Sequence, residues 1–270
     1  MSTKTTNLAN LLNDTSLLET KGYLAGKWVS GDKNRTFDVI NPSRRDTIAK
    51  VANLSREQIS AAIDIAYEAQ KEWAKKTGKE RATILRRWFD LMMENSEDLA
   101  KILTAEQGKP MAESMGEIAY GASFIEFFAE EAKRIYGELI PGHQKDKRIM
   151  VFKQPIGVAA SITPWNFPNA MITRKAGPAL AAGCAFVARP ASETPLSALA
   201  LGVLAERAGL PKGVLSILPS LDASGTGKEF CENQKVRKLT FTGSTEVGRI
   251  LLGQAANNVL KCSMELGGNA

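Results

Sequence analysis

Residues 158–168 read Val-Ala-Ala-Ser-Ile-Thr-Pro-Trp-Asn-Phe-Pro. The first five of them, at 158–162, form a short apolar run, and we expect a strand that is buried on both faces. The next six, at 163–168, contain two prolines, which restrict the backbone and end the strand. A helical stretch from about Asn169 to Ala182 follows. Strand, loop and helix in this order make one unit of an α/β fold.

The same order of elements recurs after residue 182. Each expected strand is short and apolar, and each is followed by a helical stretch or a glycine-containing segment. The strands are expected at 184–188, 214–218, 238–241 and 260–265, and the helices after Thr194-Pro195, near 223–233 and from about Thr245. This alternation predicts the α/β class, with a Rossmann-like parallel sheet flanked by helices. Ligands of such sheets bind beyond the carboxyl ends of the strands, so we expect the chemistry in the segments that follow them.

The part of the chain before residue 158 has strand and helix signals of its own. Ser55-x-x-Gln58 and Thr77-x-x-Glu80 are capping boxes, in which two side chains satisfy backbone N–H groups at the start of a helix. The expected elements are strands at 23–29 and 36–40, helices at about 55–76 and from 77 onward, and a third long helix over 111–136.

The composition is that of an ordinary soluble globular protein, with 270 residues, 44% hydrophobic and 24% charged. The net charge is +6, but basic residues are scattered among acidic ones, as in Glu-Glu-Ala-Lys-Arg at 130–134, and no nucleic-acid motif accompanies them. We therefore expect a solvated surface and no nucleic-acid partner. A modest positive potential also suits anionic ligands such as a dinucleotide and a carboxylate substrate.

Cysteine and histidine usage excludes several kinds of site. The cysteines are Cys184, Cys231 and Cys262; their number is odd and none forms a C-x-x-C pair, which argues against a disulfide scaffold and for a reducing compartment. The single histidine, His143, lies in a charged stretch and is expected to be a solvated loop residue. One histidine builds neither a His-based metal site nor a Ser-His-Asp triad, so we expect no metal.

The N-terminal segment, Met1 to Glu19, has no apolar core and no arginine. A secretory signal is therefore not expected, and an arginine-rich transit peptide is poorly supported. No run approaches the roughly 18 apolar residues of a membrane span, so we expect no membrane partner. Together these features favour a cytoplasmic protein and leave a mitochondrial one open.

Two segments that follow strands carry candidate functional residues. Asn166 lies between two prolines, and an amide held in this way can donate to a developing oxyanion; the alternative is a loop asparagine that only caps the next helix. The segment 243–248, Gly-Ser-Thr-Glu-Val-Gly, places small residues at a strand-to-helix junction, where backbone N–H groups suit a pyrophosphate. The usual G-x-G-x-x-G signature is absent, and a plain tight turn is an equal alternative.

Three of these segments together resemble a known family. Residues 162–168, 241–245 and 265–268 are similar to three hallmark motifs of the aldehyde dehydrogenases, in the same order and at fitting spacing. Gln-Gly-Lys-Pro at 107–110 and Asn-Pro at 41–42 also resemble that family, and the likeness runs from about Gly22 to the end of the chain. Within the family, three further segments look like the succinate-semialdehyde dehydrogenase branch; they lie at 81–85, 124–131 and 171–175.

The resemblance implies an aldehyde dehydrogenase type of fold in three parts. Residues 1–138 would supply the N-terminal strands and helices of the cofactor-binding domain. Residues 139–157 would be an extended oligomerisation-arm segment, and residues 158–270 the Rossmann-like dinucleotide-binding part. The C-terminal catalytic domain of the family would be lacking. Full-length members are expected to form homo-oligomers.

The resemblance also implies roles for three side chains. Asn166 would donate to the oxyanion, and Glu265 would be the general base, for which a buried carboxylate is expected. Arg174 would bind the substrate carboxylate, because a guanidinium matches its two oxygens; the alternative is a surface ion pair.

The cofactor would be NADP, with NAD possible. Many relatives carry glutamate where this chain has Ser192, and losing that carboxylate removes the repulsion of a 2′-phosphate. The family usually has lysine where this chain has Arg189, and arginine would either grip the 2′-phosphate or crowd the ribose. Leu266 would support the nicotinamide through its backbone. The full set of implied cofactor residues is Thr163, Pro164, Trp165, Arg189, Pro190, Ala191, Ser192, Gly243, Ser244, Thr245, Gly248 and Leu266.

The nucleophilic cysteine of the family lies some tens of residues beyond Glu265, whereas this sequence stops at Ala270. Cys262 is three residues before Glu265, and an odd offset on a strand points it to the opposite face. The expected function is thus NAD(P)-dependent oxidation of succinate semialdehyde, a small-molecule aldehyde, in a chain truncated before its nucleophile. The alternative is a non-catalytic fragment that binds cofactor or modulates an oligomer. A small reductase built on the nucleotide fold alone is the third and least favoured hypothesis.

Overall fold

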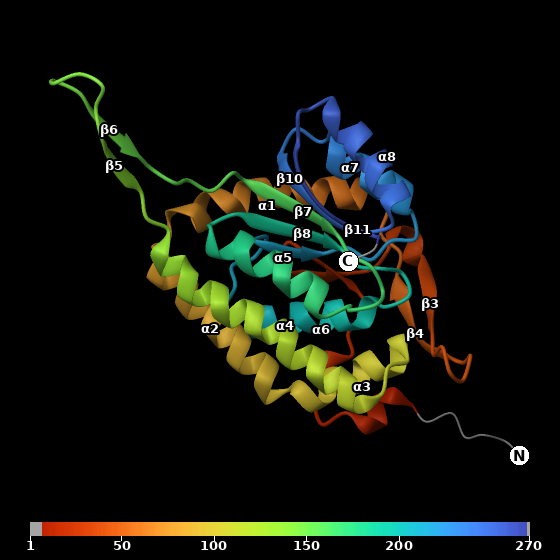
Figure 1. Ribbon diagram of the computed structural model, residues 1–270. Coiled ribbons are helices and arrows are strands. Elements are labelled where there is room, and N and C mark those ends of the chain that lie inside the picture. Colours follow the sequence, from red (N-terminus) through yellow and green to blue (C-terminus); the bar gives the residue numbers. More distant parts are fainter. Residues whose placement is uncertain (1–6, 269–270) are drawn as a thin grey trace, which may run out of the picture.

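The computed structural model describes residues 7–268 and contains one large mixed sheet (Figure 1). The strand order is β11-β10-β7-β8-β9-β1-β2, and β7 to β11 are mutually parallel while β1 and β2 pair antiparallel at one edge. The predicted α/β class with a Rossmann-like sheet is therefore confirmed. The strands are β1 (Gly22–Leu24), β2 (Lys27–Val29), β7 (Val158–Ile162), β8 (Ala185–Arg189), β9 (Leu215–Ile217), β10 (Val236–Gly243) and β11 (Lys261–Leu266).

Helices cover both faces of this sheet (Figure 1). One face packs against α1, α7 and α8, and the other against the layer made by α2 to α6. Every residue of β7 and β8 is buried because both faces of these central strands are covered. The helices are α1 (Arg56–Lys75), α2 (Gly78–Glu94), α3 (Ser96–Gln107), α4 (Met111–Glu131), α5 (Ala170–Ala181), α6 (Pro195–Arg207), α7 (Ala223–Glu232) and α8 (Thr245–Ala256).

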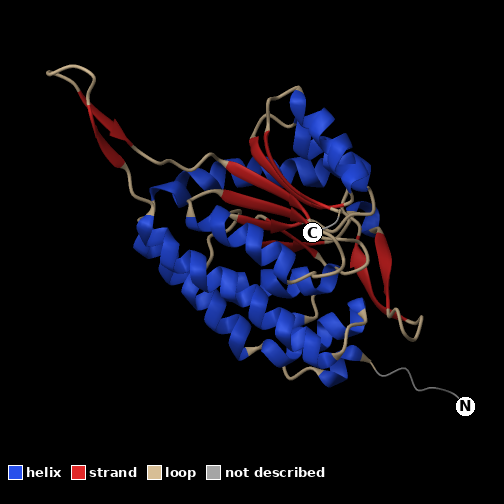
Figure 2. Cartoon of the chain, in the orientation of Figure 1, coloured by secondary structure: helices blue, strands red, loops and turns tan. Residues whose placement is uncertain are grey.

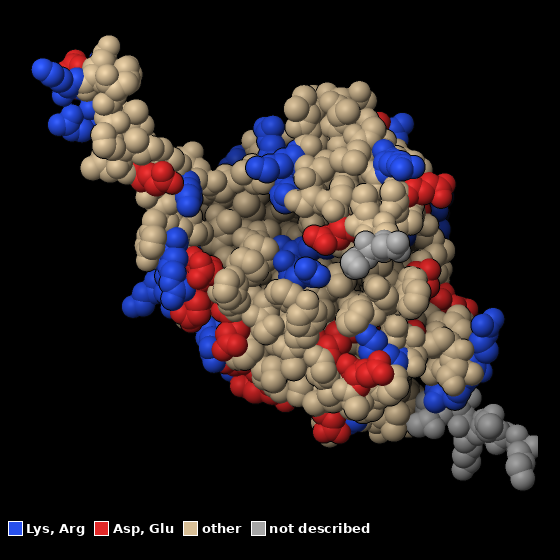
Figure 3. Space-filling model, in the orientation of Figure 1, with Lys and Arg blue, Asp and Glu red and all other residues tan. Residues whose placement is uncertain are grey.

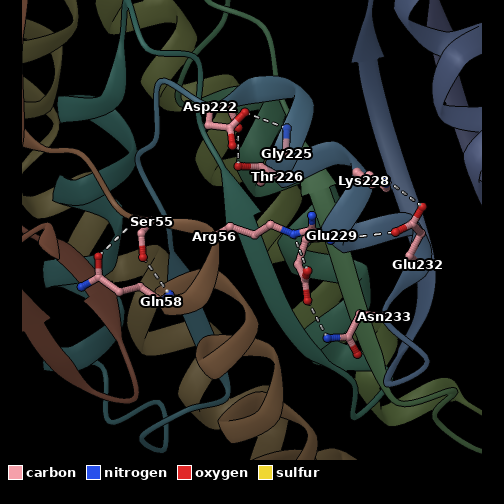
Figure 4. Close-up of polar contacts among 10 residues, drawn as sticks. All are labelled: Ser55, Arg56, Gln58, Asp222, Gly225, Thr226, Lys228, Glu229, Glu232 and Asn233. Carbon is pink, nitrogen blue, oxygen red and sulfur yellow. Dashed lines mark hydrogen bonds and ion pairs between the residues drawn. The ribbon is translucent and has the colours of Figure 1, made fainter.

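Both predicted capping boxes are confirmed. At the start of α1, the Ser55 hydroxyl accepts from the Gln58 amide, and the Gln58 side chain accepts in return from the Ser55 amide. Figure 4 shows this box beside the contact between α1 and α7, in which Arg56 Nε lies 2.9 Å from Glu229 Oε2. Asp222 caps α7 by accepting from the Gly225 amide at 2.7 Å. Capping and ion pairing thus hold α1 and α7 side by side beneath the sheet.

Two short hairpins stand apart from the main sheet. β3 (Thr36–Ile40) pairs with β4 (Thr47–Ala52), and β5 (Glu138–Pro141) pairs with β6 (Arg148–Val151). The β5–β6 hairpin projects far from the body of the molecule (Figures 1 and 2), and every residue of its two strands is exposed. The segment that the sequence suggested as extended, 139–157, is thus largely a projecting hairpin.

The structure corrects two expected elements. Residues 23–29 are not one strand, because Ala25 and Gly26 have φ of 58° and 70° and turn the chain back between β1 and β2. Gly26 also packs on Lys212, so that a Cβ there would lie 2.3 Å from its side chain. The long helix expected over 111–136 ends at Glu131 and continues only as a short 3-10 turn at Ala132–Arg134.

Of the helices within residues 7–268, none is long and apolar enough to cross a membrane. The first six residues of the Met1–Glu19 segment, on which the leader prediction partly rests, lie outside the described residues, as do the last two of the part expected at 158–270.

Candidate functional site

The carboxyl ends of the parallel strands meet at one edge of the sheet. Ile162 is in register with Arg189 on one side and with Phe241 on the other. The Thr163 amide donates to the Arg189 carbonyl oxygen at 3.3 Å, just where both strands end. Gly243 is in register with Leu266. The loops that follow β7, β8, β10 and β11 therefore start side by side, as the sheet topology requires.

The loop after β7 presents two of the predicted residues to solvent. Trp165 and Asn166 are exposed, while Thr163 is buried. The N-cap residue of α5 is Asn169, whose side chain makes no capping hydrogen bond. Asn166 is thus not the cap of the next helix, and that alternative interpretation is wrong. Within residues 7–268 its side-chain amide makes no hydrogen bond, so it is available to a ligand.

The loop after β8 combines a buried cation with a half-buried serine. Arg189 Nη2 donates to the Ser220 carbonyl oxygen at 3.0 Å, and burial lowers the pKa of Arg189. Ser192 Oγ lies 3.1 Å from Glu193 Oε2. Ser192 and Trp165 line the same cavity of about 520 Å³. Pro190 and Ala191 are buried behind them.

The junction between β10 and α8 is packed tightly against the end of β11. Ser244 is the N-cap of α8 and accepts from the Val247 amide at 3.3 Å. Thr245 Oγ1 donates to the Gly267 carbonyl oxygen at 2.9 Å. A Cβ on Gly248 would lie 2.5 Å from Leu266 Cδ2, so glycine permits this close approach. The start of α8 and the segment after β11 thereby form one surface.

Several buried polar atoms at this edge have no hydrogen-bond partner within residues 7–268. They include Thr163 Oγ1, Arg189 Nε, Thr194 Oγ1 and Thr242 Oγ1. Buried polar atoms are normally satisfied, so their concentration around the strand ends fits a polar ligand. Within the same range, no group of three or more His, Cys, Asp or Glu side chains is arranged to hold a metal ion.

Glu265 and Arg174 line a second cavity, of about 410 Å³, between α5 and the face of the sheet. Its lining extends to Ile156 and Cys184, just before β7 and β8, and does not include Asn166. Glu265 is exposed in this chain, contrary to the expected buried carboxylate, because β11 is the edge strand of the sheet. Basic and acidic side chains lie next to one another near the C-terminal end of the chain on the face shown in Figure 3. The cavity itself is lined by charged side chains of both signs, among them Lys175, Lys238 and Glu265.

Arg174 is half-buried on α5 and has an apolar setting. Its Nη1 lies 4.0 Å from Met171 Sδ, and its guanidinium carbon lies 5.4 Å from the centre of the Phe124 ring. In the described part of the chain it forms no ion pair, so the alternative of a surface ion pair is wrong. A half-buried guanidinium without a carboxylate is suited to an anionic ligand.

Lys175 is a site residue that sequence reasoning missed. It is buried next to the same cavity, and its Nζ donates to Thr240 Oγ1 at 3.1 Å. Burial lowers the pKa of Lys175 to about 8, against the opposing charge of Glu265. The signal was present in the sequence, because a second basic residue follows Arg174 in an otherwise apolar helix.

The cysteines do not face the candidate site in a reactive state. Cys262 packs against the apolar cluster under α7 and α8, whereas Glu265 lines the cavity on the other side of β11, which confirms that the two point apart. Burial raises the pKa of Cys262, and it raises that of Cys231 to about 12. Cys184 borders the cavity but is buried, and burial raises its pKa as well.

Tyr67 and Lys71 have the Tyr-x-x-x-Lys spacing of small reductases, the least favoured hypothesis, but they lie away from the candidate site. Both are on α1, and the Lys71 ammonium is 4.7 Å from the Tyr67 ring while pairing with Glu68 at 2.7 Å. Lys235, directly before β10, also lies over the Tyr67 ring. The pair is therefore at the amino end of the parallel strands, away from the candidate site.

Comparison with known proteins identifies similar chains. The family model described as "Aldehyde dehydrogenase family" matches residues 28–270. The chain is 58% identical over 259 residues to the glutarate-semialdehyde dehydrogenase of Pseudomonas aeruginosa, covering 96% of this chain and 53% of that protein. It is 57% identical over 259 residues to the NADP-linked succinate-semialdehyde dehydrogenase GabD of Escherichia coli K12, covering 96% and 54%.

A solved structure agrees with these matches. The crystal structure of an NADP-dependent enzyme of E. coli superposes with a TM-score of 0.95 at 57% identity, over 96% of this chain and 54% of that one. The chain spans about half the length of the curated relatives it matches.

Proposed function

This chain belongs to the aldehyde dehydrogenase family, and from that premise we propose that it binds NADP within an enzyme that oxidises a semialdehyde with a distal carboxylate. Succinate semialdehyde is the first candidate substrate, and glutarate semialdehyde, the substrate in the name of one relative, is the second. The activity is proposed for the whole protein, because the chain spans about half the length of its relatives.

The observation that carries the proposal is the meeting of four loops at the carboxyl edge of the sheet, with unpartnered buried polar atoms among them. The pyrophosphate would lie at the N-terminus of α8, beside Gly243, Ser244, Thr245 and Gly248. Thr163, Pro164 and Trp165 would border the nucleotide on one side, and Leu266 would support its nicotinamide ring. When bound, NADP supplies the acceptor for a hydride from the substrate.

The adenosine ribose would lie against residues 189–192. Ser192 is half-buried, and its hydroxyl donates to Glu193. The serine side chain is small and uncharged, so it leaves space for a 2′-phosphate and does not itself repel it. The buried Nε of Arg189 has no hydrogen-bond partner within the described chain. The buried Arg189 and the lack of a carboxylate at position 192 support NADP over NAD. The Glu193 carboxylate, 3.1 Å from Ser192 Oγ, would have to turn away from a 2′-phosphate, and NAD stays the alternative cofactor.

The substrate would lie at the Glu265 side of the cavity between α5 and the face of the sheet. Arg174 would bind its distal carboxylate, since the guanidinium is half-buried and has no acidic partner in the described residues. Asn166 would donate its side-chain amide to the oxyanion that forms at the aldehyde carbon. Glu265 would accept a proton from the nucleophile or from the hydrolytic water.

The nucleophile is proposed to come from the part of the whole protein that this chain does not span. Cys184, Cys231 and Cys262 have raised thiol pKa values, and a thiolate is the reactive form.

The second candidate function is that of a non-catalytic fragment that modulates an oligomer. The β5–β6 hairpin supports the subunit contact that this function requires, because Leu139, Met150 and Phe152 are 72%, 65% and 75% exposed on an element that contacts little of its own chain. We expect these side chains to pack on another subunit. Mixing the chain with a full-length relative and measuring both the mass of the complex and its activity tests this function.

The main proposal is tested by assaying the whole protein with NADP and two aldehydes of equal length, succinate semialdehyde and butanal. The wild-type protein should oxidise succinate semialdehyde with the higher kcat/KM. Arg174→Ala should lower that value about tenfold or more while changing kcat/KM for butanal little. Only succinate semialdehyde has a distal carboxylate, so only this substrate loses a contact with Arg174. An equal effect on both aldehydes would remove Arg174 from substrate recognition.

A further inference from the structure

The loop that carries Asn166 is restrained by its own sequence at four of its six positions. Pro164 and Pro168 have φ values fixed by their rings. Thr163 and Phe167 precede prolines and are confined to extended conformations. Only Trp165 and Asn166 are left with ordinary backbone freedom, and Asn166 is the residue whose amide must be held in place.

Lys109 removes that remaining freedom. Its Nζ donates to the backbone carbonyl oxygen of Asn166 at 3.0 Å and lies 3.9 Å from the centre of the Phe167 ring. The first contact fixes the peptide plane between Asn166 and Phe167, and the second is a cation–π contact with the next side chain. Lys109 therefore contacts the residues on both sides of the Asn166–Phe167 peptide bond, although it lies 57 residues before Asn166 in the chain.

Glu117 holds Lys109 and the helix that follows the loop at the same time. Its Oε2 lies 2.6 Å from Lys109 Nζ, and its Oε1 accepts from the amides of Asn169 at 2.9 Å and Ala170 at 3.3 Å. Asn169 provides no side-chain cap for α5, so Glu117 replaces it from the neighbouring helix α4. The Glu117 side chain is 0% exposed and that of Lys109 10%, so water does not compete with these bonds.

A glycine on α4 lets the two helices approach closely enough for this contact. Gly121 lies one turn after Glu117, and a Cβ there would be 2.2 Å from Asn169 Oδ1 and 3.3 Å from Ala170 Cα. The start of α5 therefore rests directly on α4. The geometry of the loop before it is set by the same helix that presents Glu117.

We propose that Lys109 and Glu117 are positioning residues for Asn166: the ion pair clamps both ends of the segment 166–170 and so holds the amide at the strand edge in one orientation. This inference rests on the proposed function, in which the Asn166 amide meets the oxyanion. It assigns a role to the Gln-Gly-Lys-Pro segment at 107–110. The backbone of Lys109 is held within this segment as well, because its amide donates to Gln107 Oε1 at 2.9 Å.

The test compares hydrogen–deuterium exchange and kinetics in three variants. Lys109→Met removes the donor at similar length. The double variant Lys109→Met/Glu117→Gln also removes the buried charge that the first leaves unpaired, and its new amide oxygen can still cap α5. Lys133→Met, which breaks the exposed pair of Lys133 with Glu130 near the other end of α4, is the matched control.

In the 270-residue chain, both Lys109 variants should raise the exchange rate of the Met171 amide about tenfold or more, because this amide donates to the Phe167 carbonyl oxygen at 2.9 Å and the loop that carries its acceptor is released. The rates in β8 and in the second half of α5 should stay as in the wild type, and Lys133→Met should change none of these rates. In the whole protein, both variants should lower kcat for the aldehyde about tenfold while the Kd for NADP stays within about twofold.

Unchanged exchange at the Met171 amide in both Lys109 variants would overturn the inference, whatever the enzyme does. Faster exchange with an unchanged kcat in an active whole protein would also overturn it, since the pair would then serve structure alone. A wild-type protein that oxidises no aldehyde would defeat the proposed function instead, a result that the exchange of the loop does not depend on.

Discussion

The amide of Thr163 donates to the carbonyl oxygen of Arg189 at 3.3 Å, one residue beyond the last ladder pair of β7 and β8. This bond ties the loop that carries Asn166 to the loop that carries Ser192 at the point where both leave the sheet. A ligand that spans the two loops therefore meets segments that are joined to one another where they leave the sheet.

Glu106 supports the loop at 189–194 through the helix that follows it. The side chain is fully buried, and its two oxygens accept from the amides of Leu196 at 2.8 Å and Ser197 at 2.7 Å, at the start of α6. We expect Glu106→Ala to lower the free energy of unfolding by about 2–4 kcal/mol, because two buried N–H groups lose their acceptor. Glu106→Gln, which keeps one acceptor, should cost about half as much in urea denaturation. Equal stability of Glu106→Ala and the wild type would show that water replaces the carboxylate.

Lys175 should make stability depend on alkaline pH. Its pKa of about 8 in the folded chain lies below the ordinary 10.5, so protonation is penalised in the native state. The penalty is complete below the folded pKa and disappears as the pH rises through 10.5, which means that stability rises over this window. The penalty is about 2 kcal/mol, allowing for the solvent that reaches the cavity.

Lys175→Met removes this dependence. The free energy of unfolding of the variant minus that of the wild type should therefore be most positive at about pH 7 and should decrease by about 2 kcal/mol towards about pH 10. Urea titrations of both proteins at matched pH values measure the difference. A difference that is constant with pH would mean that Lys175 keeps its ordinary pKa in the folded chain.

Cys262 should be dispensable for both binding and chemistry. It packs against the apolar cluster on the face of β11 opposite Glu265, and its thiol pKa is raised. We expect Cys262→Ala to leave the Kd for NADP and any aldehyde oxidation within about twofold of the wild type, and the wild-type thiol to alkylate more slowly than free cysteine at neutral pH. Mass spectrometry after iodoacetamide treatment gives the rate. Rapid alkylation together with loss of turnover in the variant would make Cys262 a nucleophile.

Ser192 should decide between the two nicotinamide cofactors. Ser192→Glu adds a carboxylate next to the expected position of the 2′-phosphate, so the Kd for NADP should rise about tenfold or more while the Kd for NAD changes less. Ser192→Ala is the matched control, since it removes the hydroxyl without adding charge, and it should affect both cofactors little. Isothermal titration of the three proteins with both cofactors provides the values. A parallel rise for NADP and NAD would point to a general disturbance of the loop.

Much of the fold was predictable from local patterns. The run at 158–168 predicted β7, its proline-bound loop and α5 almost to the residue, because a short apolar run and fixed proline backbones are local properties. The two capping boxes predicted the starts of α1 and α2 for the same reason.

The features that could not be predicted depend on contacts distant in sequence. The turn at Ala25-Gly26 packs on Lys212, and Lys109 reaches Asn166 across 57 residues. Neither contact leaves a periodic signal in the local sequence. The exposure of Glu265 likewise depends on β11 being an edge strand, which is a property of the whole sheet.

The most direct test of the account is hydrogen–deuterium exchange of the 270-residue chain with and without saturating NADP. The nucleotide should protect amides at 163–166, at 190–193 and at the start of α8 near Gly243 to Gly248, the segments that meet at the carboxyl edge of the sheet. Amides near Tyr67 and Lys235, at the opposite edge, should exchange as before. Absence of protection at saturating NADP, or protection confined to the opposite edge, would contradict the account.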